Sequence, residues 1–202
     1  MKKTINRRSF IQNTLLKGSA TMAGLSAFSA QNTLAASNPN YGITGQMAPE
    51  LDVPYWIDAE GNDTQFKLAD QRGKFVFMKC WQAWCPGCHS RGFPTLQKVT
   101  EAFIDEPKVL TLGIQTTFEG FSTNSKNRVR EMQLRYDLPI LMGHDTGKGK
   151  RHERPTTMLN YRTGGTPWLI LVAPDGKVIF DDYHINTENA IAFLRTEVAK
   201  LA

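Results

Sequence analysis

The hydrophobic residues of this chain fall into short continuous runs and longer periodic segments. Continuous apolar runs over 75–81, 108–114 and 168–172 are typical of buried strands, which are hydrophobic on both faces. Apolar side chains recur at helical spacing over 93–103 and 187–201, which predicts two amphipathic helices. The pattern therefore predicts strands that alternate with helices.

Weaker signals lie between these elements. They predict a hairpin over 56–68, a surface helix over 125–136, a short strand over 139–142 and a returning strand over 178–180. Strands that alternate with helices and end in a hairpin plus a helix predict an α/β fold with a mixed central sheet. No internal repeat or second domain is evident in the sequence.

Side-chain spacing gives finer expectations for the helices. Pro94 lies inside the first long helix and is expected to kink it. The surface helix is expected to bury Val129, Met132 and Tyr136. One face of the last helix is predicted to pack inward, with the residues Ala190, Ile191, Leu194, Val198 and Leu201.

The net charge of +5 comes from the beginning of the chain. Residues 1–36 contain five basic side chains and no acidic one, so the remainder has 19 basic and 19 acidic side chains. The calculated pI of 9.2 therefore reflects the basic residues within 1–36 and not the rest of the chain. A neutral domain gives no electrostatic reason to expect a nucleic-acid partner.

Residues 1–36 have the layout of an export signal, with a basic start, a weakly apolar middle and small residues near the end. Asn6-Arg7-Arg8-Ser9-Phe10 resembles a twin-arginine signal, and ordinary secretion or a retained anchor are the alternatives. We expect a periplasmic or other extracytoplasmic protein. Its expected parts are a signal peptide over 1–36, a polar arm over 37–47 and a folded domain over 48–202.

Cys85 and Cys88 follow directly on the strand predicted over 75–81. If a helix begins at Pro86, which has no N–H to lose there, Cys88 lies one turn beyond Cys85 on the same face. The unpaired N–H groups and the dipole of the helix N-terminus stabilise a thiolate at Cys85. We therefore predict a redox pair in which Cys85 attacks a disulfide and Cys88 resolves the product.

The third cysteine, Cys80, lies in the middle of an apolar strand. It is predicted to be buried and unreactive, and a third redox cysteine is the alternative. In an oxidising compartment, paired cysteines often stabilise the fold, but closing so short a loop as Cys85 to Cys88 removes little chain entropy. This pair is expected to carry out chemistry instead.

Five short motifs carry a family resemblance: Ala48-Pro49, Gly73-Lys74-Phe75-Val76, Trp81-x-x-Trp84-Cys85-x-x-Cys88, Gly165-Thr166-Pro167 and Asp175-Gly176. From about Ala48 onward the chain resembles the TlpA/ResA-like branch of thioredoxin-fold proteins, which are exported thiol–disulfide oxidoreductases related to the AhpC/TSA redoxins. The resemblance implies a thioredoxin-like three-layer α/β sandwich with a mixed central sheet. It also implies an exchange reaction that needs no cofactor.

The resemblance implies roles for individual residues. Pro167 is expected to be a cis proline packed against the cysteine pair, and the cis form costs little only at X–Pro bonds. Thr166 is expected to offer its backbone to an extended substrate, with Trp84 as a further substrate contact. Glu119 is a candidate proton relay by its position in the family pattern, and a solvated loop acid is the alternative.

Two rival interpretations involve metals. Cys85-Pro86-Gly87-Cys88-His89 matches the attachment motif for c-type haem, although neither Trp84 nor Thr166-Pro167 is needed for a haem pocket. A further candidate metal set has irregular spacing and comprises His144, Asp145, His152 and Glu153.

A peroxiredoxin-like thiol peroxidase on the same fold is the remaining rival. That chemistry normally uses Pro and Thr seven and three residues before the attacking cysteine, where this chain has Met78 and Gln82. We therefore favour thiol–disulfide exchange, more in the direction of reducing protein or small-molecule disulfides. A reductant in an oxidising compartment needs an electron source, and a membrane thiol donor is expected. The basic loop over 147–154 is either solvated or a contact for an acidic partner.

Overall fold

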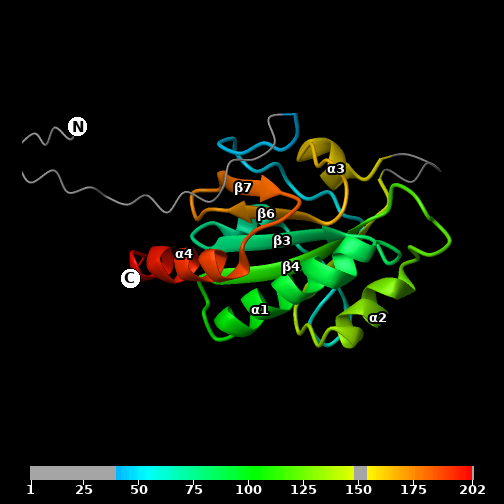
Figure 1. Cartoon of the computed structure of the whole chain (residues 1–202), viewed down its shortest axis with the longest axis horizontal. Helices are drawn as coiled ribbons and strands as arrows, with labels where there is room; N and C mark the ends of the chain where they lie inside the picture. Colours follow the sequence, from blue (N-terminus) through cyan, green and yellow to red (C-terminus); the bar gives the residue numbers. More distant parts are fainter. Residues whose placement is uncertain (1–39, 148–153, 202) are drawn as a thin grey trace, which may run out of the picture. The chain divides into compact units, whose positions relative to one another are not determined.

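The hydrophobic runs become the strands of one seven-stranded sheet in the computed structural model, which describes residues 40–147 and 154–201. The strand order is β2-β1-β5-β4-β3-β6-β7, and β7, β6, β3 and β4 follow one another down the view in Figure 1. The strands are β1 Tyr55–Ile57, β2 Asp63–Thr64, β3 Phe75–Trp81, β4 Val109–Thr116, β5 Leu141–Asp145, β6 Trp168–Val172 and β7 Val178–Asp182.

Strand β3 lies inside this sheet, next to the central strand β4. It pairs in parallel with β4 and antiparallel with β6, and β4 pairs in parallel with β5. The outer pairs β1–β2, β1–β5 and β6–β7 are antiparallel. The predicted mixed central sheet is therefore confirmed, and all seven residues of β3 are buried, as their continuous apolar run predicted.

The side chains of β3 alternate between two hydrophobic cores. Phe77 and Trp81 point into the core that is covered by α1, α2 and α4, whereas Met78 and Cys80 point into the core that is covered by α3 and the segment over 43–53. The helices are α1 Phe93–Phe103, α2 Asn127–Arg135, α3 Thr156–Asn160 and α4 Thr187–Ala199, with a short 3₁₀ turn over Leu68–Gln71. These layers on both faces confirm the predicted α/β class.

A π-helical turn over Cys88–Gly92 precedes α1, where the sequence predicted a continuous helix with a kink. The N–H of Phe93 donates to the carbonyl of Cys88, five residues back. Pro94 is the physical reason, because its ring removes a donor and crowds the carbonyl four residues earlier. The proline is accommodated by a wider helical turn, which contains Cys88.

Other differences from the sequence prediction are local. The predicted strand over 139–142 is observed two to three residues later, as β5, and it continues through Gly143, where a Cβ would lie 2.9 Å from the Trp56 ring. Helix α3 was not predicted, because five residues are too short to show a helical period. In the last helix Ala190 and Leu194 are buried as predicted, but Leu201 is exposed.

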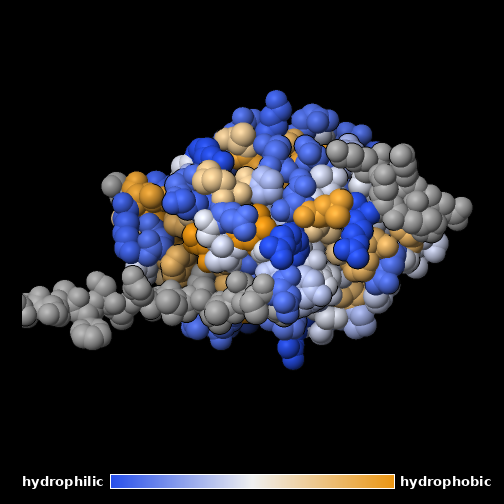
Figure 2. All heavy atoms as spheres, turned by 90° about the horizontal axis from the view of Figure 1, so that it is seen from above, coloured by the Kyte–Doolittle hydropathy of each residue, from blue (hydrophilic) through white to orange (hydrophobic). Residues whose placement is uncertain are grey.

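The surface is mainly hydrophilic on the side of β7 and α3, with scattered hydrophobic patches (Figure 2). Among the residues that the structure describes, no helix combines the length and apolar character that crossing a membrane requires. The predicted signal peptide, the first residues of the polar arm and most of the basic loop over 147–154 lie outside the described residues.

Candidate active site

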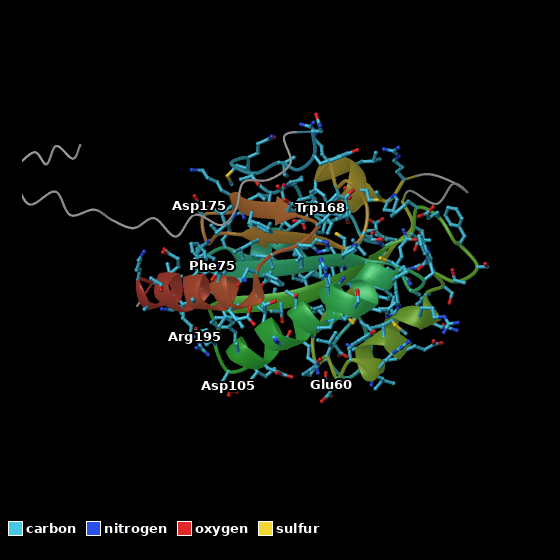
Figure 3. The ribbon with its side chains drawn as sticks, in the orientation of Figure 1. Glu60, Phe75, Asp105, Trp168, Asp175 and Arg195 are labelled. Carbon is cyan, nitrogen blue, oxygen red and sulfur yellow. The ribbon has the colours of Figure 1, made fainter. Side chains whose placement is uncertain are left out.

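The candidate site lies where β3 ends and β6 begins, because Cys80 and Trp168 are paired across these two antiparallel strands. Figure 3 shows Trp168 at this end of the sheet and Phe75, the first residue of β3, at the other. Residues 82–84 leave β3 as a turn, and helical backbone starts at Pro86, as the sequence predicted. Cys85 therefore stands directly before a helical segment, at the end of the sheet where β3 finishes.

The two cysteines of the predicted pair lie in close contact. The backbone N–H of Cys88 donates to Cys85 Sγ at 3.2 Å and to the Cys85 carbonyl at 3.0 Å. Both thiols are free, and Cys85 is 4% exposed while Cys88 is fully buried. One sulfur thus borders the surface and its partner lies behind it.

The environment makes the two thiols very different in acidity. Hydrogen bonds from the Cys88 side chain and, more weakly, from Thr166 and the Cys88 backbone lower the pKa of Cys85 to about 5, against an opposing effect of burial. Burial, followed by the hydrogen bond with Cys85, raises the pKa of Cys88 above its ordinary value. At neutral pH this arrangement holds a thiolate at Cys85 and a thiol at Cys88.

The Thr166–Pro167 peptide bond is cis, as expected from the resemblance. Cys85 Sγ lies 3.4 Å from the carbonyl oxygen of Thr166, to which the protonated form of the thiol donates. A Cβ on Gly87 would lie 3.1 Å from Pro167 Cδ, and one on Gly92 would lie 3.2 Å from Pro167 Cβ. The proline ring therefore packs against the helix between two positions that have no side chain.

Trp84 is 45% exposed beside the cysteine pair, and its indole N–H donates to Gln82 Oε1 at 2.7 Å. Together with Thr166 and Glu119 it lines a groove of about 420 Å³, whose other walls come from Tyr41, Met158 and their neighbours. Glu119 is exposed, and among the described hydrogen bonds its side chain has none to either cysteine. Its predicted role as a proton relay stays a prediction.

Asn124 organises the loop in front of the pair, and the sequence analysis did not identify it. Its side chain is 1% exposed; it accepts from the Ala83 N–H at 2.7 Å and donates to Gln82 Oε1 at 2.9 Å. It also donates to the backbone carbonyls of Glu119 and Gly120. One polar residue after β4 thus fixes both the turn before Cys85 and one wall of the groove.

Lys79 is the second residue that sequence reasoning missed, although its signal was visible as the one charged residue in the apolar run over 75–81. It is fully buried on β3, and among the described residues its amine makes no hydrogen bond of standard geometry. Among the neighbouring charges, those of Cys88 and Cys85 have the largest effects on the pKa of that amine.

Cys80 is fully buried in the other core, as predicted. Burial, reinforced by the charge of Asp145, raises the pKa of its thiol to about 12. This sulfur lies on the opposite face of β3 from the core that contains Cys85 and Cys88. Its surroundings agree with an unreactive thiol and not with a third redox cysteine.

The residues of the haem and metal alternatives have protein partners. Both ring nitrogens of His89 are engaged, Nδ1 with the Tyr136 hydroxyl and Nε2 with the Ala83 carbonyl, each at 2.6 Å. The carboxylate of Asp145 accepts backbone N–H groups at the start of α3, and His144 Nδ1 contacts Gln115 Oε1 at 2.6 Å. His152 and Glu153, the other members of the predicted metal set, lie outside the described residues.

The chain is similar to several known proteins in sequence and in fold. "Thioredoxin-like protein YneN" of Bacillus subtilis (strain 168) is 23% identical over 145 residues, covering 71% of this chain and 72% of that protein. The crystal structure of the thioredoxin-like superfamily protein SPOA0173 is 33% identical with a TM-score of 0.64, covering 77% of this chain and 95% of the other. A thiol-disulfide isomerase from Corynebacterium glutamicum is 27% identical with a TM-score of 0.63, covering 75% and 96%.

These similarities establish a thioredoxin-like fold for the described domain. The match to a sequence family runs over residues 44–181, which is more than half of the chain and includes Cys85, Cys88 and Pro167. The chain therefore belongs to the AhpC/TSA family.

Proposed function

We propose that this protein is an exported thiol–disulfide oxidoreductase that works through Cys85 and Cys88. The observation that carries the proposal is the difference between the two sulfurs, an acidic one in a residue that is 4% exposed and a protonated one in a residue that is fully buried. The Cys85 thiolate attacks one sulfur of a substrate disulfide, which forms a mixed disulfide and releases the first substrate thiolate. Cys88 then attacks Cys85 Sγ, which closes the protein disulfide and releases the second.

The groove beside the pair supports a peptide-like substrate. Thr166 and Trp84 line one continuous depression with Glu119, next to the sulfur that borders the surface. The exposed ring of Trp84 offers an apolar contact, and the backbone of Thr166 is available to an extended chain. A protein disulfide presented by such a chain is the proposed substrate class.

Replacing the second cysteine tests the mechanism directly. The Cys88→Ser variant is expected to accumulate a covalent Cys85–substrate complex, because no neighbouring sulfur can release it. Non-reducing gels and mass spectrometry of the adduct measure this. Cys80→Ser is the matched control and is expected to trap nothing. Absence of an adduct in Cys88→Ser, with full exchange activity retained, would contradict the mechanism.

We infer that the protein passes electrons to its substrate disulfides and is a weak reductant. The resemblance to exported reductases favours a reductant, whereas the stabilised Cys85 thiolate favours the reduced protein and raises the potential. The two effects oppose each other, so the expected potential lies between the ends of the range from about −270 to −120 mV that related scaffolds cover. Equilibration against glutathione measures it, and a value near about −120 mV, which belongs to a strong oxidant, would refute this inference.

Export is proposed from the leader, with electrons supplied by a membrane thiol donor. The basic start and the Arg7-Arg8 pair support the twin-arginine route. Replacing both arginines by lysine is expected to keep the protein on the inner side of the membrane, as cell fractionation would show. Release of the mature protein by this double variant would favour ordinary secretion.

The peroxidase alternative receives less support from the site. Met78 and Gln82, at the positions where peroxiredoxins carry Pro and Thr, are both fully buried. Met78 points into the core on the far side of β3, and Gln82 is occupied by Trp84 and Asn124. Neither residue therefore offers a hydroxyl to a peroxide at Cys85.

A further inference from the structure

Lys79 is a buried cation-forming side chain that the exchange mechanism so far does not use. It lies on β3 between Met78 and Cys80, which both point into the core away from the pair. Because side chains alternate along a strand, Lys79 points to the same face as Phe77 and Trp81, the face that carries Cys85 and Cys88. Its side chain is fully buried there.

The amine of Lys79 occupies a space that the fold leaves for it. A Cβ on Gly92, in the π-helical turn, would lie 2.1 Å from Nζ, so only glycine permits the amine at this place. That same Cβ would lie 3.2 Å from the Pro167 ring, and Nζ lies 4.9 Å from the centre of the Phe93 ring. The amine thus lies beneath the cysteine-bearing turn and close to Pro167.

The groups around this amine are thiols. Cys88, Cys85 and Cys80, in that order, act on Lys79 through their charges. The residues paired with Lys79 on the neighbouring strands are Gly113 and Leu169, and neither can titrate. Among the described residues no carboxylate is paired with this amine, and burial lowers the pKa of Lys79.

We propose that the amine of Lys79 is the internal proton acceptor for Cys88 in the second step of exchange. The inference rests on the proposed function and adds a residue to it. In the mixed disulfide, Cys88 must lose a proton before it can attack, yet burial holds that proton in place. Lys79 can accept this proton, because its amine lies against Gly92 in the turn that also carries Cys88.

Cys88, Lys79, Cys85 and the substrate account for every proton and electron in this step. The Cys88 S–H bond breaks and its proton moves to Lys79 Nζ, which becomes an ammonium. The Cys88 sulfur then bonds to Cys85 Sγ while the bond from Cys85 to the substrate sulfur breaks, so two electrons leave with the substrate thiolate. The ammonium returns its proton to that thiolate directly or through solvent.

Reaction of the reduced protein with Ellman's reagent separates the two steps. Attack by Cys85 releases one coloured thiolate, and resolution by Cys88 releases a second, so stopped-flow absorbance reads both phases. In Lys79→Met the second phase is expected to slow about 100-fold at pH 7, the lower range for loss of a general base. The pH at which it is half-maximal is expected to rise, and the first phase is expected to slow far less.

Matched variants separate this role from packing. Lys98→Met removes a lysine that is exposed on α1 and is expected to leave both phases as in the wild type. Lys79→Gln keeps a polar side chain but no base, so it is expected to behave like Lys79→Met. A second phase of wild-type rate and pH dependence in both Lys79 variants would overturn the proposal.

Two measurements on the wild-type protein also test the role of Lys79. If the variants do not fold, the wild-type second phase decides, since it is expected to be half-maximal below pH 9.0, the ordinary value for a cysteine thiol. A midpoint above that pH would overturn the role of Lys79. A wild-type protein with no second phase would instead overturn the exchange mechanism itself, so the two failures are distinguishable.

Discussion

Cys80 and Cys85 are five residues apart in sequence and lie on opposite sides of β3. On the helix side, hydrogen bonds from Cys88 and Thr166 bring the pKa of Cys85 to about 5. On the other side, Cys80 is enclosed by apolar side chains, and burial raises its pKa to about 12. The comparison teaches that chain position alone does not make a cysteine reactive. Donors directed at the sulfur do, and burial without them suppresses it.

The strongest way to break this comparison is to remove each sulfur in turn. Cys85→Ser is expected to lower disulfide exchange by about 1,000-fold or more, because a hydroxyl at neutral pH does not replace a thiolate nucleophile. Cys80→Ser is expected to retain exchange within about twofold, since its sulfur contacts only the far core. Reduction of insulin disulfides measures both. Loss of exchange in Cys80→Ser, with an unchanged melting temperature, would show that Cys80 takes part.

The pH dependence of alkylation sharpens the same difference. The Cys85 thiolate is protonated as pH falls through about 5, so its reaction with iodoacetamide is expected to be half-maximal near that pH. An unfolded cysteine is half-ionised only near pH 9.0, so ionisation at Cys85 stabilises the folded, reduced protein at neutral and alkaline pH. That stabilisation is lost as pH falls through about 5. Labelling of Cys80 at neutral pH before unfolding would contradict the assignment.

The smallest expected effects come from the polar residues that support each side. Asn124→Ala is expected to lower the free energy of unfolding by about 2 kcal/mol, because three partly buried backbone groups lose their hydrogen-bond partner. On the Cys80 side, Tyr161→Phe removes one hydrogen bond, to the Pro49 carbonyl, and is expected to cost about 1 kcal/mol.

Urea denaturation and exchange assays together test this pair. Only Asn124→Ala is expected to slow exchange as well, since Asn124 fixes the turn before Cys85. Asn127→Ala, at an exposed position on α2, is the control for loss of an amide and is expected to change little. Equal slowing of exchange by Tyr161→Phe would mean that the two sides of the sheet are not independent.

The fold was largely predictable because its strands are long apolar runs. Strand β3 was predicted to the residue, and the cis bond before Pro167 followed from the family resemblance. The π-helical turn was not predicted, because a proline near the start of a helix signals a disturbance but not the form it takes. Helix α3 was not predicted from the sequence, because the carboxylate that accepts its first N–H groups belongs to Asp145, outside the helix.

The site was predictable in part for a similar reason. Cys85 and Cys88 stand out through their spacing, whereas Asn124 and Lys79 act only through tertiary contacts. Asn124 is one of several polar residues in its loop, and nothing local shows that its amide reaches the turn before Cys85. Lys79 was conspicuous in its apolar run, but the space that Gly92 leaves for its amine is visible only in three dimensions.

Because the fold encloses the Cys80 sulfur, the order of folding and oxidation decides which cysteines can pair. Three unfolded cysteines can join in three pairings, and only the Cys85–Cys88 pairing fits the proposed mechanism. Once β3 is in the sheet, the Cys80 sulfur has no access to oxidants, so mispairing is prevented by the fold alone. A chain that folds before it meets an oxidising compartment, as twin-arginine transport would allow, reaches its destination with a single possible bridge.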